Sequence, residues 1–315
     1  MGYSLYPKII PKIKKVLEQK RLKLLSEPPE FFVQKKLRFY HALCKSKEGK
    51  KVFFKSLLKR EAGIKNRFFN EILILKTLRE NKKLPLAKKV PKLLDFSFKK
   101  DFPFLIYEFL PGKSKTRQDK LSPDDIKKAI SLMVLINSTE YNFNFVPKKP
   151  LFNFRRYSKT IFSLLKRLKI ERKIKKKILK FVEKTKEVFK FTKPKLNHGD
   201  FSEANLIFYK GKVKIVDWEH VHFRNPLYDF VSFWTKRKRE RKQIEKEFFA
   251  QQKDIESFFP LFKMALIEIS LKNLIFFNEM LKFLEKEKKT KENQKAKGER
   301  KKEIKETLEL LKKYL

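Results

Sequence analysis

The sequence is poor in the features that mark secreted and membrane proteins. Its 315 residues include one cysteine, Cys44, which excludes an internal disulfide and fits a reducing compartment. The N-terminus lacks a basic segment followed by a long apolar run and a cleavage site, so we expect no secretory signal. The most apolar long stretch, residues 261–281, contains Lys263, Glu268 and Lys272 at spacings typical of an amphipathic helix. These absences predict a soluble, cytoplasmic protein with no membrane span.

Acidic residues are scarce relative to basic ones. The chain has 80 Lys and Arg against 36 Asp and Glu, which gives a formal charge of +44. Such an excess would ordinarily indicate binding to nucleic acid, an anionic membrane or a polyanionic substrate. The basic residues are spread from Lys8 to Lys313, however, and lysine and phenylalanine enrichment together are what an AT-rich genome produces. We interpret the charge as mainly compositional, so we expect only weak, non-specific binding of nucleic acid.

The recognisable chemistry is concentrated in residues 196–234. His198-Gly199-Asp200 is followed five residues after the aspartate by Asn205, and Asp217 ends an apolar run. Phosphoryl transfer needs one carboxylate to orient an attacking hydroxyl, and an Asn and a second carboxylate to hold the metal that bridges the nucleotide phosphates. The three polar residues therefore indicate a phosphotransferase.

The local pattern also predicts how these residues meet. Residues 205–209 and 212–216 are short β-prone runs around Lys210-Gly211, which is typical of a hairpin. Such a hairpin carries Asn205 at one end and Asp217 at the other. Because Asp200 lies in the loop before it, the three side chains should converge on one side of the hairpin.

The sequence HGDFSEAN, followed by IVDWE and NPLYD, resembles the motifs of the aminoglycoside phosphotransferase and choline kinase superfamily. These small-molecule kinases share the protein-kinase-like fold. The resemblance implies ATP and Mg²⁺ as cofactors, Asp200 as the catalytic base, and Asn205 and Asp217 as magnesium ligands. It also implies that His198 and Asp229 support the loop, although a purely structural hydrogen bond is at least as good an interpretation of these two residues and of Glu219.

The resemblance extends upstream to the nucleotide site. Lys55 follows an apolar run and Glu71 lies in a helical one, which are the places of the family's phosphate-binding lysine and its glutamate partner. Lys51 and Lys59 are alternatives to Lys55. Residues 105–112, LIYEFLPG, resemble the hinge between lobes, so backbone groups of Glu108, Phe109 and Leu110 are expected to bind adenine. No G-x-G-x-x-G lies near the first hairpin, which leaves residues 34–37 as a weak candidate for the phosphate loop.

The implied architecture is α+β and bilobal, with a small antiparallel-sheet N-lobe and a larger helical C-lobe. We expect a basic N-terminal helix within residues 1–30, a nucleotide-binding N-lobe over 31–112, a catalytic and acceptor-binding C-lobe over 113–285 and a charged tail over 286–315. Helices are predicted over 6–25, 64–79, 122–138, 154–168, 171–191, 240–252 and 261–286, and strands over 31–44, 51–58, 91–98 and 103–109.

Rival functions remain at this point. A degenerate kinase-like scaffold that binds nucleic acid or an anionic membrane would explain the charge, but it predicts the loss of a catalytic residue, and all are present. A protein kinase is disfavoured because Pro226 comes nine residues after Asp217, which leaves no room for an activation loop. His220 and His222 stand two apart, as metal ligands can, but no cysteine or third histidine is near. The sequence therefore predicts an ATP-dependent phosphotransferase that acts on a small-molecule hydroxyl.

Overall fold

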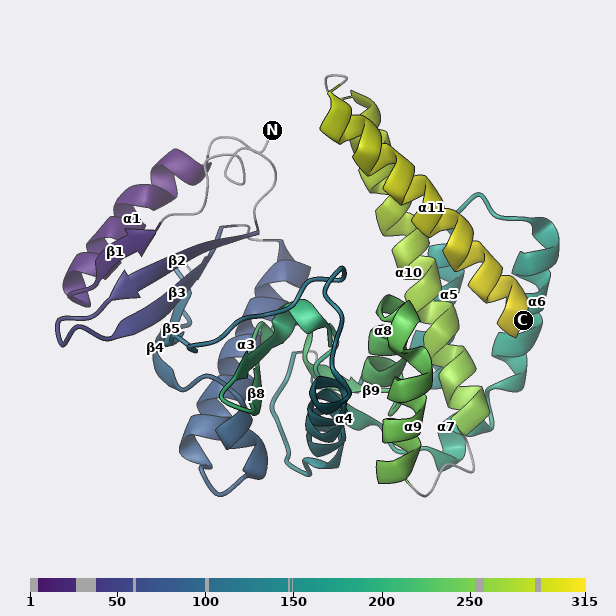
Figure 1. The fold of residues 1–315 in the computed structure, drawn as a ribbon, viewed down its shortest axis with the longest axis horizontal. Helices are drawn as coiled ribbons and strands as arrows, with labels where there is room; N and C mark the ends of the chain where they lie inside the picture. Colours follow the sequence, from purple (N-terminus) through teal and green to yellow (C-terminus); the bar gives the residue numbers. More distant parts are fainter. Residues whose placement is uncertain are drawn as a thin grey trace. The chain divides into compact units, whose positions relative to one another are not determined.

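The computed structural model describes residues 5–26, 38–58, 61–99, 102–146, 148, 150–252, 258–286 and 290–315 (Figure 1). The chain divides into two compact units. The first comprises Met1–Lys149 and His198–His222, and the second comprises Pro150–Asn197 and Phe223–Leu315. Among the helices of these described ranges, none is long and apolar enough to cross a membrane.

The first unit contains a five-stranded antiparallel sheet, a hairpin and several helices. Its elements are α1 (Leu5–Gln19), β1 (Lys23–Ser26), β2 (Phe39–Lys45), β3 (Lys51–Leu57), α3 (Ala62–Glu80), the 3-10 helix η1 (Pro85–Lys89), β4 (Leu93–Ser97), β5 (Phe104–Glu108), α4 (Pro123–Ser138), η2 (Glu203–Asn205), β7 (Leu206–Tyr209), β8 (Lys212–Ile215) and η3 (Trp218–His220). The strand order of the sheet is β1-β2-β3-β5-β4.

The two faces of this sheet are covered by different helices. Side chains alternate between the faces of a strand, so Phe54 and Lys55 of β3 point in opposite directions. Phe54 is fully buried in one cluster with Ile13 and Leu17 of α1. On the other face, Phe39 of β2 stacks on the Phe68 ring of α3 with 5.6 Å between centroids. Figure 1 shows α1 and α3 flanking the sheet, and the alternation therefore directs Lys55 toward α3.

The first helix is shorter than its sequence predicts. Residues 6–25 were expected to be one helix, but α1 ends at Gln19 and residues 23–26 form strand β1. Arg21 adopts a positive φ of 52°. The Leu22 N–H then donates to Leu17 O at 2.8 Å and the Arg21 N–H to Glu18 O at 2.9 Å, which is a Schellman ending. Edge pairing with β2 overrides the helical periodicity here. The helix itself packs on the sheet through Ile13 and Leu17.

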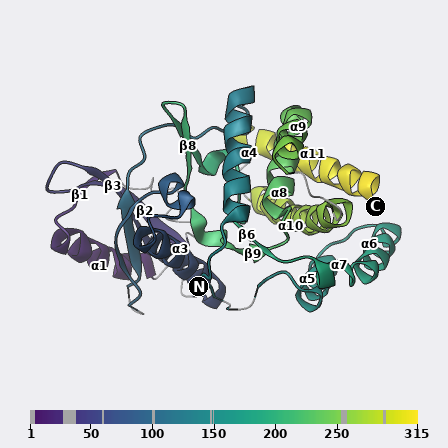
Figure 2. The same ribbon diagram turned by 90° about the horizontal axis from the view of Figure 1, so that it is seen from below.

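The other predicted elements of this unit form with small shifts of their ends. The hairpin turn between β2 and β3, helix α3, and strands β4 and β5 all occur where expected, and residues 31–37 lie outside the described part of the chain. Helix α4 begins with the predicted cap, because the Asp125 N–H donates to Ser122 Oγ at 3.1 Å and the Ser122 N–H to Asp125 Oδ2 at 3.1 Å. Helix α4 lies beside β8 (Figure 2).

The second unit is almost entirely helical. Its elements are α5 (Phe154–Lys166), α6 (Arg172–Lys184), α7 (Val188–Phe191), β6 (Lys195–Asn197), β9 (His222–Arg224), α8 (Tyr228–Lys236), the 3-10 helix η4 (Lys238–Glu240), α9 (Arg241–Gln251), α10 (Phe258–Lys286) and α11 (Lys291–Tyr314). The single helix expected over 171–191 is two helices, because the chain turns at Thr185, whose N–H and hydroxyl both bond Val182 O.

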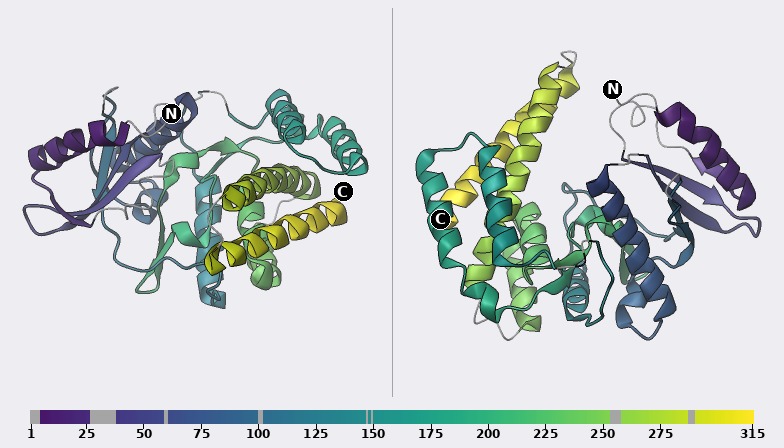
Figure 3. Two further views of the ribbon diagram at one scale, coloured as in Figure 1. Left: turned by 90° about the horizontal axis from the view of Figure 1, so that it is seen from above. Right: turned by 180° about the vertical axis from the view of Figure 1, so that it is seen from behind.

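The charged C-terminal stretch is a helix that docks on the rest of the unit. Figure 3 shows α11 running beside α10 in both views. Leu311 is fully buried, and the Tyr314 ring lies 5.5 Å from that of Phe262. Lys238 and Glu306 form an ion pair. The predicted charged tail is thus a helix that packs on the unit through Leu311 and Tyr314.

Leu311→Ala should destabilise the protein, because it leaves a cavity at a fully buried position where α11 meets the unit. We expect a loss of about 2–5 kcal/mol in the free energy of unfolding, measured by urea titration. Leu310→Ala removes the same atoms from the adjacent, half-buried residue and should cost clearly less. Equal losses in the two variants would contradict docking through Leu311.

Candidate active site

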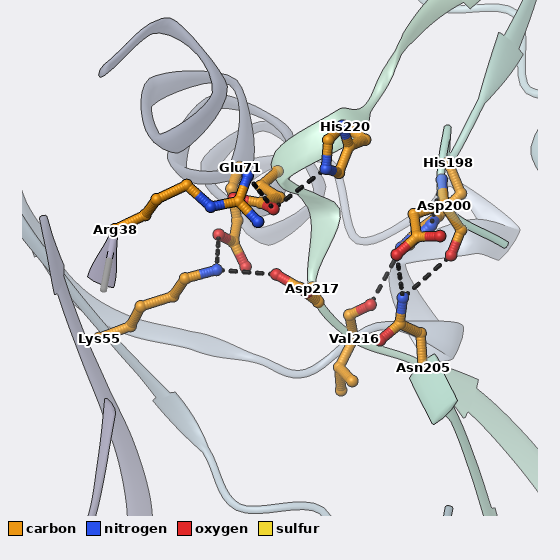
Figure 4. A network of polar contacts seen from close by, with 10 residues as sticks. Arg38, Lys55, Glu71, His198, Asp200, Asn205, Val216, Asp217 and His220 are labelled. Carbon is orange, nitrogen blue, oxygen red and sulfur yellow. Dashed lines mark hydrogen bonds and ion pairs between the residues drawn. The ribbon is translucent and has the colours of Figure 1, made fainter. Parts of the chain in front are cut away.

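Lys55 is the centre of a buried ionic cluster in the first unit. Its Nζ donates to Glu71 Oε2 at 2.6 Å and to Asp217 Oδ1 at 2.8 Å (Figure 4). Lys55 and Glu71 are 2% and 1% exposed, so water contributes little to their solvation. The structure thus brings together a strand lysine, a helix glutamate and the aspartate that follows β8.

The protonation states within this cluster follow from burial and mutual charge. Burial would lower the pKa of Lys55, but the Asp217 and Glu71 carboxylates outweigh it and raise the pKa. Burial would raise the pKa of Asp217, but the Lys55 ammonium overrides it and holds the pKa well below its usual range. Burial, helped by the Asp217 charge, raises the pKa of Glu71 against the attraction of Lys55. Lys55 and Asp217 are therefore held as a charged pair.

The hairpin positions Asp217 and Asn205 as predicted. β7 pairs with β8 from Leu206↔Ile215 to Tyr209↔Lys212. Lys210 and Gly211 have φ of 45° and 70°, as a tight hairpin turn with positive φ at both central residues requires. The Val216 N–H then donates to Asn205 O at 3.0 Å, which brings the two ends of the hairpin together.

Asp217 itself has a left-handed backbone, with φ 63° and ψ 61°. Few residues other than glycine adopt this conformation, which costs roughly 1 kcal/mol, although aspartate tolerates it better than most. The conformation ends β8 abruptly and begins η3. Such a kink directs the Asp217 carboxylate toward Lys55, and strained positions of this kind cluster at functional sites.

Asn205 is tied to Asp200. Its Nδ2 donates to the Asp200 carbonyl at 2.9 Å and to Asp200 Oδ2 at 3.3 Å. Because the amide nitrogen of Asn205 donates to Asp200, its amide oxygen, Oδ1, is directed away from Asp200. Both residues are half-buried, and Figure 4 shows them next to each other. The predicted meeting of Asp200 and Asn205 is thus observed, whereas the Asp217 carboxylate, at the other end of the hairpin, bonds Lys55.

His198 supports this loop in its neutral form. Burial lowers its pKa to about 4. The Asp200 N–H donates to His198 Nδ1 at 3.4 Å, so the ring proton lies on Nε2 and is donated to Val216 O at 3.0 Å. The ring also packs edge-on against Trp218, 4.7 Å between centroids. His198 therefore ties the Asp200 loop to the end of β8.

Asp229, the second predicted support, is fully buried at the start of α8 in the second unit. Its N–H donates to Asn197 Oδ1 at 3.2 Å, and Asn197 directly precedes His198 in the sequence.

The predicted hinge residues continue from β5. The Glu108 N–H donates to Lys92 O at 3.0 Å and the Phe109 N–H to Lys51 O at 3.3 Å. The Glu108 carboxylate accepts a bond from Lys214 at 2.9 Å. Within the described part of the chain, the Leu110 N–H is the one of the three that has no backbone acceptor. Of these three N–H groups, the one of Leu110 therefore remains available to donate a hydrogen bond.

Sequence reasoning did not assign a second buried carboxylate network next to the first. Glu219 Oε1 lies 3.0 Å from His220 Nε2 and 3.6 Å from Arg38 Nη1. Burial would raise the pKa of Glu219, but the His220 hydrogen bond and the Lys55 charge lower it. The DWE motif gave the only sequence signal for this group, and nothing local indicated Arg38.

The structure gives no support to a histidine metal site. His220 binds Glu219, whereas the buried His222 ring packs against Phe145 at 5.7 Å. Among the residues described, no group of three or more His, Cys, Asp or Glu side chains could hold a metal ion. Residues 34–37, the weak phosphate-loop candidate, lie outside the described ranges.

Kinase-like folds pair a strand lysine with a helix glutamate. An aspartate, an asparagine and a second aspartate then follow in the chain, as they do here. The model of the phosphotransferase enzyme family matches residues 62–258, which is more than half of the sequence. The chain therefore belongs to this family, and the predicted resemblance is confirmed. The match begins after Lys55, so this lysine is placed by the structure and not by the family model.

Solved structures agree on the fold. Spectinomycin phosphotransferase, in complex with ADP and spectinomycin, is 12% identical over 97% of this chain and 98% of that one, with a TM-score of 0.62. Plasmodium vivax ethanolamine kinase is 15% identical over 98% and 89%, with a TM-score of 0.61. Macrolide 2'-phosphotransferase from Brachybacterium faecium is 11% identical over 92% and 97%, with a TM-score of 0.62. At these identities the likeness shows the fold alone, and it confirms the α+β kinase-like prediction. No curated protein matches the sequence significantly.

Gly199→Ala should destabilise the loop that carries Asp200. Gly199 has φ +83°, and a Cβ there would lie 2.1 Å from the backbone oxygen of His220, which cannot rotate away. We expect a loss of about 1–3 kcal/mol or more in the free energy of unfolding. Gly298→Ala, in the exposed interior of α11 with open space around it, should instead stabilise by about 0.5–1 kcal/mol. Urea midpoints that move in the same direction would contradict this account.

Proposed function

We propose that this protein transfers the γ-phosphoryl group of ATP to a hydroxyl of a small molecule. The observation that carries the proposal is the buried Lys55 held between Glu71 and Asp217. Removing the Lys55 ammonium and the Glu71 carboxylate from water costs several kcal/mol per ion, and well-packed apolar side chains would often serve stability as well. A polar cluster of this kind in a phosphotransferase is best explained by its chemistry.

The nucleotide phosphates are the natural partners of Lys55. Glu71 orients the ammonium, and the phosphates replace Asp217 as its second partner when the nucleotide binds. The Leu110 N–H at the hinge would donate to the adenine edge. Two similar structures support nucleotide use, since spectinomycin phosphotransferase is in complex with ADP and amicoumacin kinase with AMP-PNP and Ca²⁺.

A divalent cation fits the donor set that remains. Asn205 Oδ1 faces away from Asp200, and only Oδ1 of the Asp217 carboxylate bonds Lys55. Magnesium commonly takes one or two protein oxygens and completes its shell with water and substrate phosphates. One ammonium and the three carboxylates of Glu71, Asp200 and Asp217 sum to a formal charge of −2, which a divalent cation would neutralise. When bound, Mg²⁺ would supply positive charge against the nucleotide phosphates.

Asp200 would act on the acceptor. Its carboxylate accepts the proton of the attacking hydroxyl as the oxygen forms its bond to the γ-phosphorus and the bond to ADP breaks. Asn205 holds the carboxylate through Nδ2, and neutral His198 holds the loop through Val216. Catalysis then relies on positioning and on electrostatic stabilisation of the transferred group.

The proposal favours a small-molecule acceptor over a protein. Asp217 leads directly into η3 and β9, so the chain offers no activation loop between Asp217 and Pro226. Incubation of the purified protein with ATP, Mg²⁺ and a panel of small hydroxyl compounds tests the proposed function. Formation of ADP that depends on one compound, together with the phosphorylated product, is the expected result, and its absence across the panel with no nucleotide binding would refute the function.

Asp200→Asn should abolish most phosphoryl transfer, because the amide cannot accept the hydroxyl proton. We expect kcat to fall by about 10²- to 10⁴-fold, with nucleotide affinity unchanged or tighter. Asp124→Asn makes the same change in an exposed carboxylate on α4 and should leave kcat unchanged. Near-wild-type turnover in Asp200→Asn would remove this residue from the mechanism.

Asp217→Asn should weaken the magnesium dependence of ATP binding, because a neutral amide replaces a charged ligand. We expect the tightening of ATP binding by Mg²⁺ to fall at least about 10-fold, measured by titration with Mg²⁺ and with EDTA. The control is Asp95→Asn, which breaks an exposed pair with Lys20 in the same unit. An identical magnesium effect in wild type and Asp217→Asn would show that Asp217 is not a ligand.

A further inference from the structure

The second unit contains a cavity that the proposed chemistry of Lys55, Asp217 and Asp200 does not use. Its volume is about 450 Å³, within the range of small-molecule sites. Three separate segments form the walls: residues 151–164 with α5, residues 224–228 at the end of β9 and the start of α8, and Glu268 and Lys272 of α10. All of them belong to the same unit.

The charges around this cavity are unbalanced. Arg156, Lys159, Arg224 and Lys272 line it, and Glu268 is the only carboxylate among the lining residues. Four cations against one anion give a formal charge of +3. The surplus is local, because these side chains line one cavity, although Lys159 is also exposed at the surface.

Glu268 is already neutralised by its neighbours. Its Oε1 accepts a hydrogen bond from Lys272 Nζ. Burial would raise the pKa of Glu268, but the charges of Lys272 and Arg224 outweigh it and lower the pKa, so the carboxylate stays ionised. Lys272 also donates to the Tyr228 hydroxyl at 3.2 Å. Glu268 and Lys272 therefore form one paired unit in the wall.

Contacts within the unit hold the two arginines of the cavity lining in place. The Arg224 guanidinium lies 5.0 Å from the centre of the Tyr228 ring, an attractive cation–π arrangement. Arg156 Nη1 donates to Pro150 O at 3.4 Å. Phe152 and Leu164 supply apolar wall, while the hydroxyls of Thr160 and Ser163 come from the same helix as Arg156. This mixture suits a small molecule that is both hydroxylated and anionic.

We infer that this cavity binds a hydroxylated small molecule that carries a phosphate or carboxylate group. Arg156 and Arg224 bind the anionic group, because a guanidinium fork matches both phosphate and carboxylate oxygens. A cationic ligand would meet like charge on several sides of the cavity.

Four probes that share one sugar ring and differ in charge test the ligand class. The full chain, without nucleotide, is titrated calorimetrically with glucose 6-phosphate, glucuronate, glucose and glucosamine. At least one of the two anions should bind about 10-fold or more tightly than glucose, and glucosamine most weakly. The comparison of glucose 6-phosphate with glucuronate distinguishes phosphate from carboxylate. Failure of both anions to bind at millimolar concentration, or tighter binding of glucosamine, would overturn the inference.

Two adjacent arginines of α5 provide a matched pair of variants. Arg156 lines the cavity, whereas Arg155 is exposed and does not. Arg156→Gln should weaken binding of the preferred anion by about 10- to 100-fold, the value of one charged hydrogen bond, and Arg155→Gln should change it less than about 2-fold. If Arg156→Gln does not fold, Lys159→Gln, at an exposed position on the same wall, is the second variant whose binding of the anion should be weaker than that of the wild type. Equal effects of the Arg155 and Arg156 changes would refute the cavity as the site.

Discussion

The buried ammonium of Lys55 is the constraint on which the first unit depends. Three elements meet at it: β3 supplies the lysine, α3 supplies Glu71, and the end of β8 supplies Asp217. Losing one partner of a buried ion pair costs about 3–5 kcal/mol, because a charge is left without compensation. The sheet meets the need for these partners by giving its two faces different neighbours. α1 covers the face that carries Phe54, and the opposite face is left for α3 and the charged cluster.

The β7–β8 hairpin brings together two residues that are distant in sequence. Asn205 and Asp217 are separated by twelve positions in sequence, and antiparallel pairing returns the chain so that the backbone of Val216 bonds that of Asn205. The left-handed backbone of Asp217 then turns its carboxylate to Lys55, while Asn205 turns its amide to Asp200. His198 ties the loop to the hairpin through one neutral ring. A short segment thus supplies the groups that we propose act on the phosphates and on the acceptor.

The overall charge of +44 says little about the chemistry, because the local charges have different signs. The Lys55 cluster and Asp200 are formally acidic, which suits a divalent cation, whereas the cavity beside α5 and α10 is formally basic. Dispersed surface lysines are screened over about 8–10 Å at physiological ionic strength. Partly buried charges are screened much less, so the enclosed groups decide which ligands bind. Composition alone cannot separate these two populations of charge.

The sequence by itself determined the hairpin, the α4 cap and the α3 helix, because turn chemistry and periodicity are local properties, whereas Lys55 and Glu71 were paired through the resemblance to the family's motifs. It did not determine that residues 23–26 join a sheet or that residues 171–191 break into two helices, since pairing with β2 and the turn at Thr185 override local periodicity. Only the tertiary structure placed Arg38 near Glu219, and only it brought α5, residues 224–228 and α10 around one cavity. Those contacts join segments far apart in the chain, and their formation depends on long-range packing, which leaves no spacing signature in the sequence.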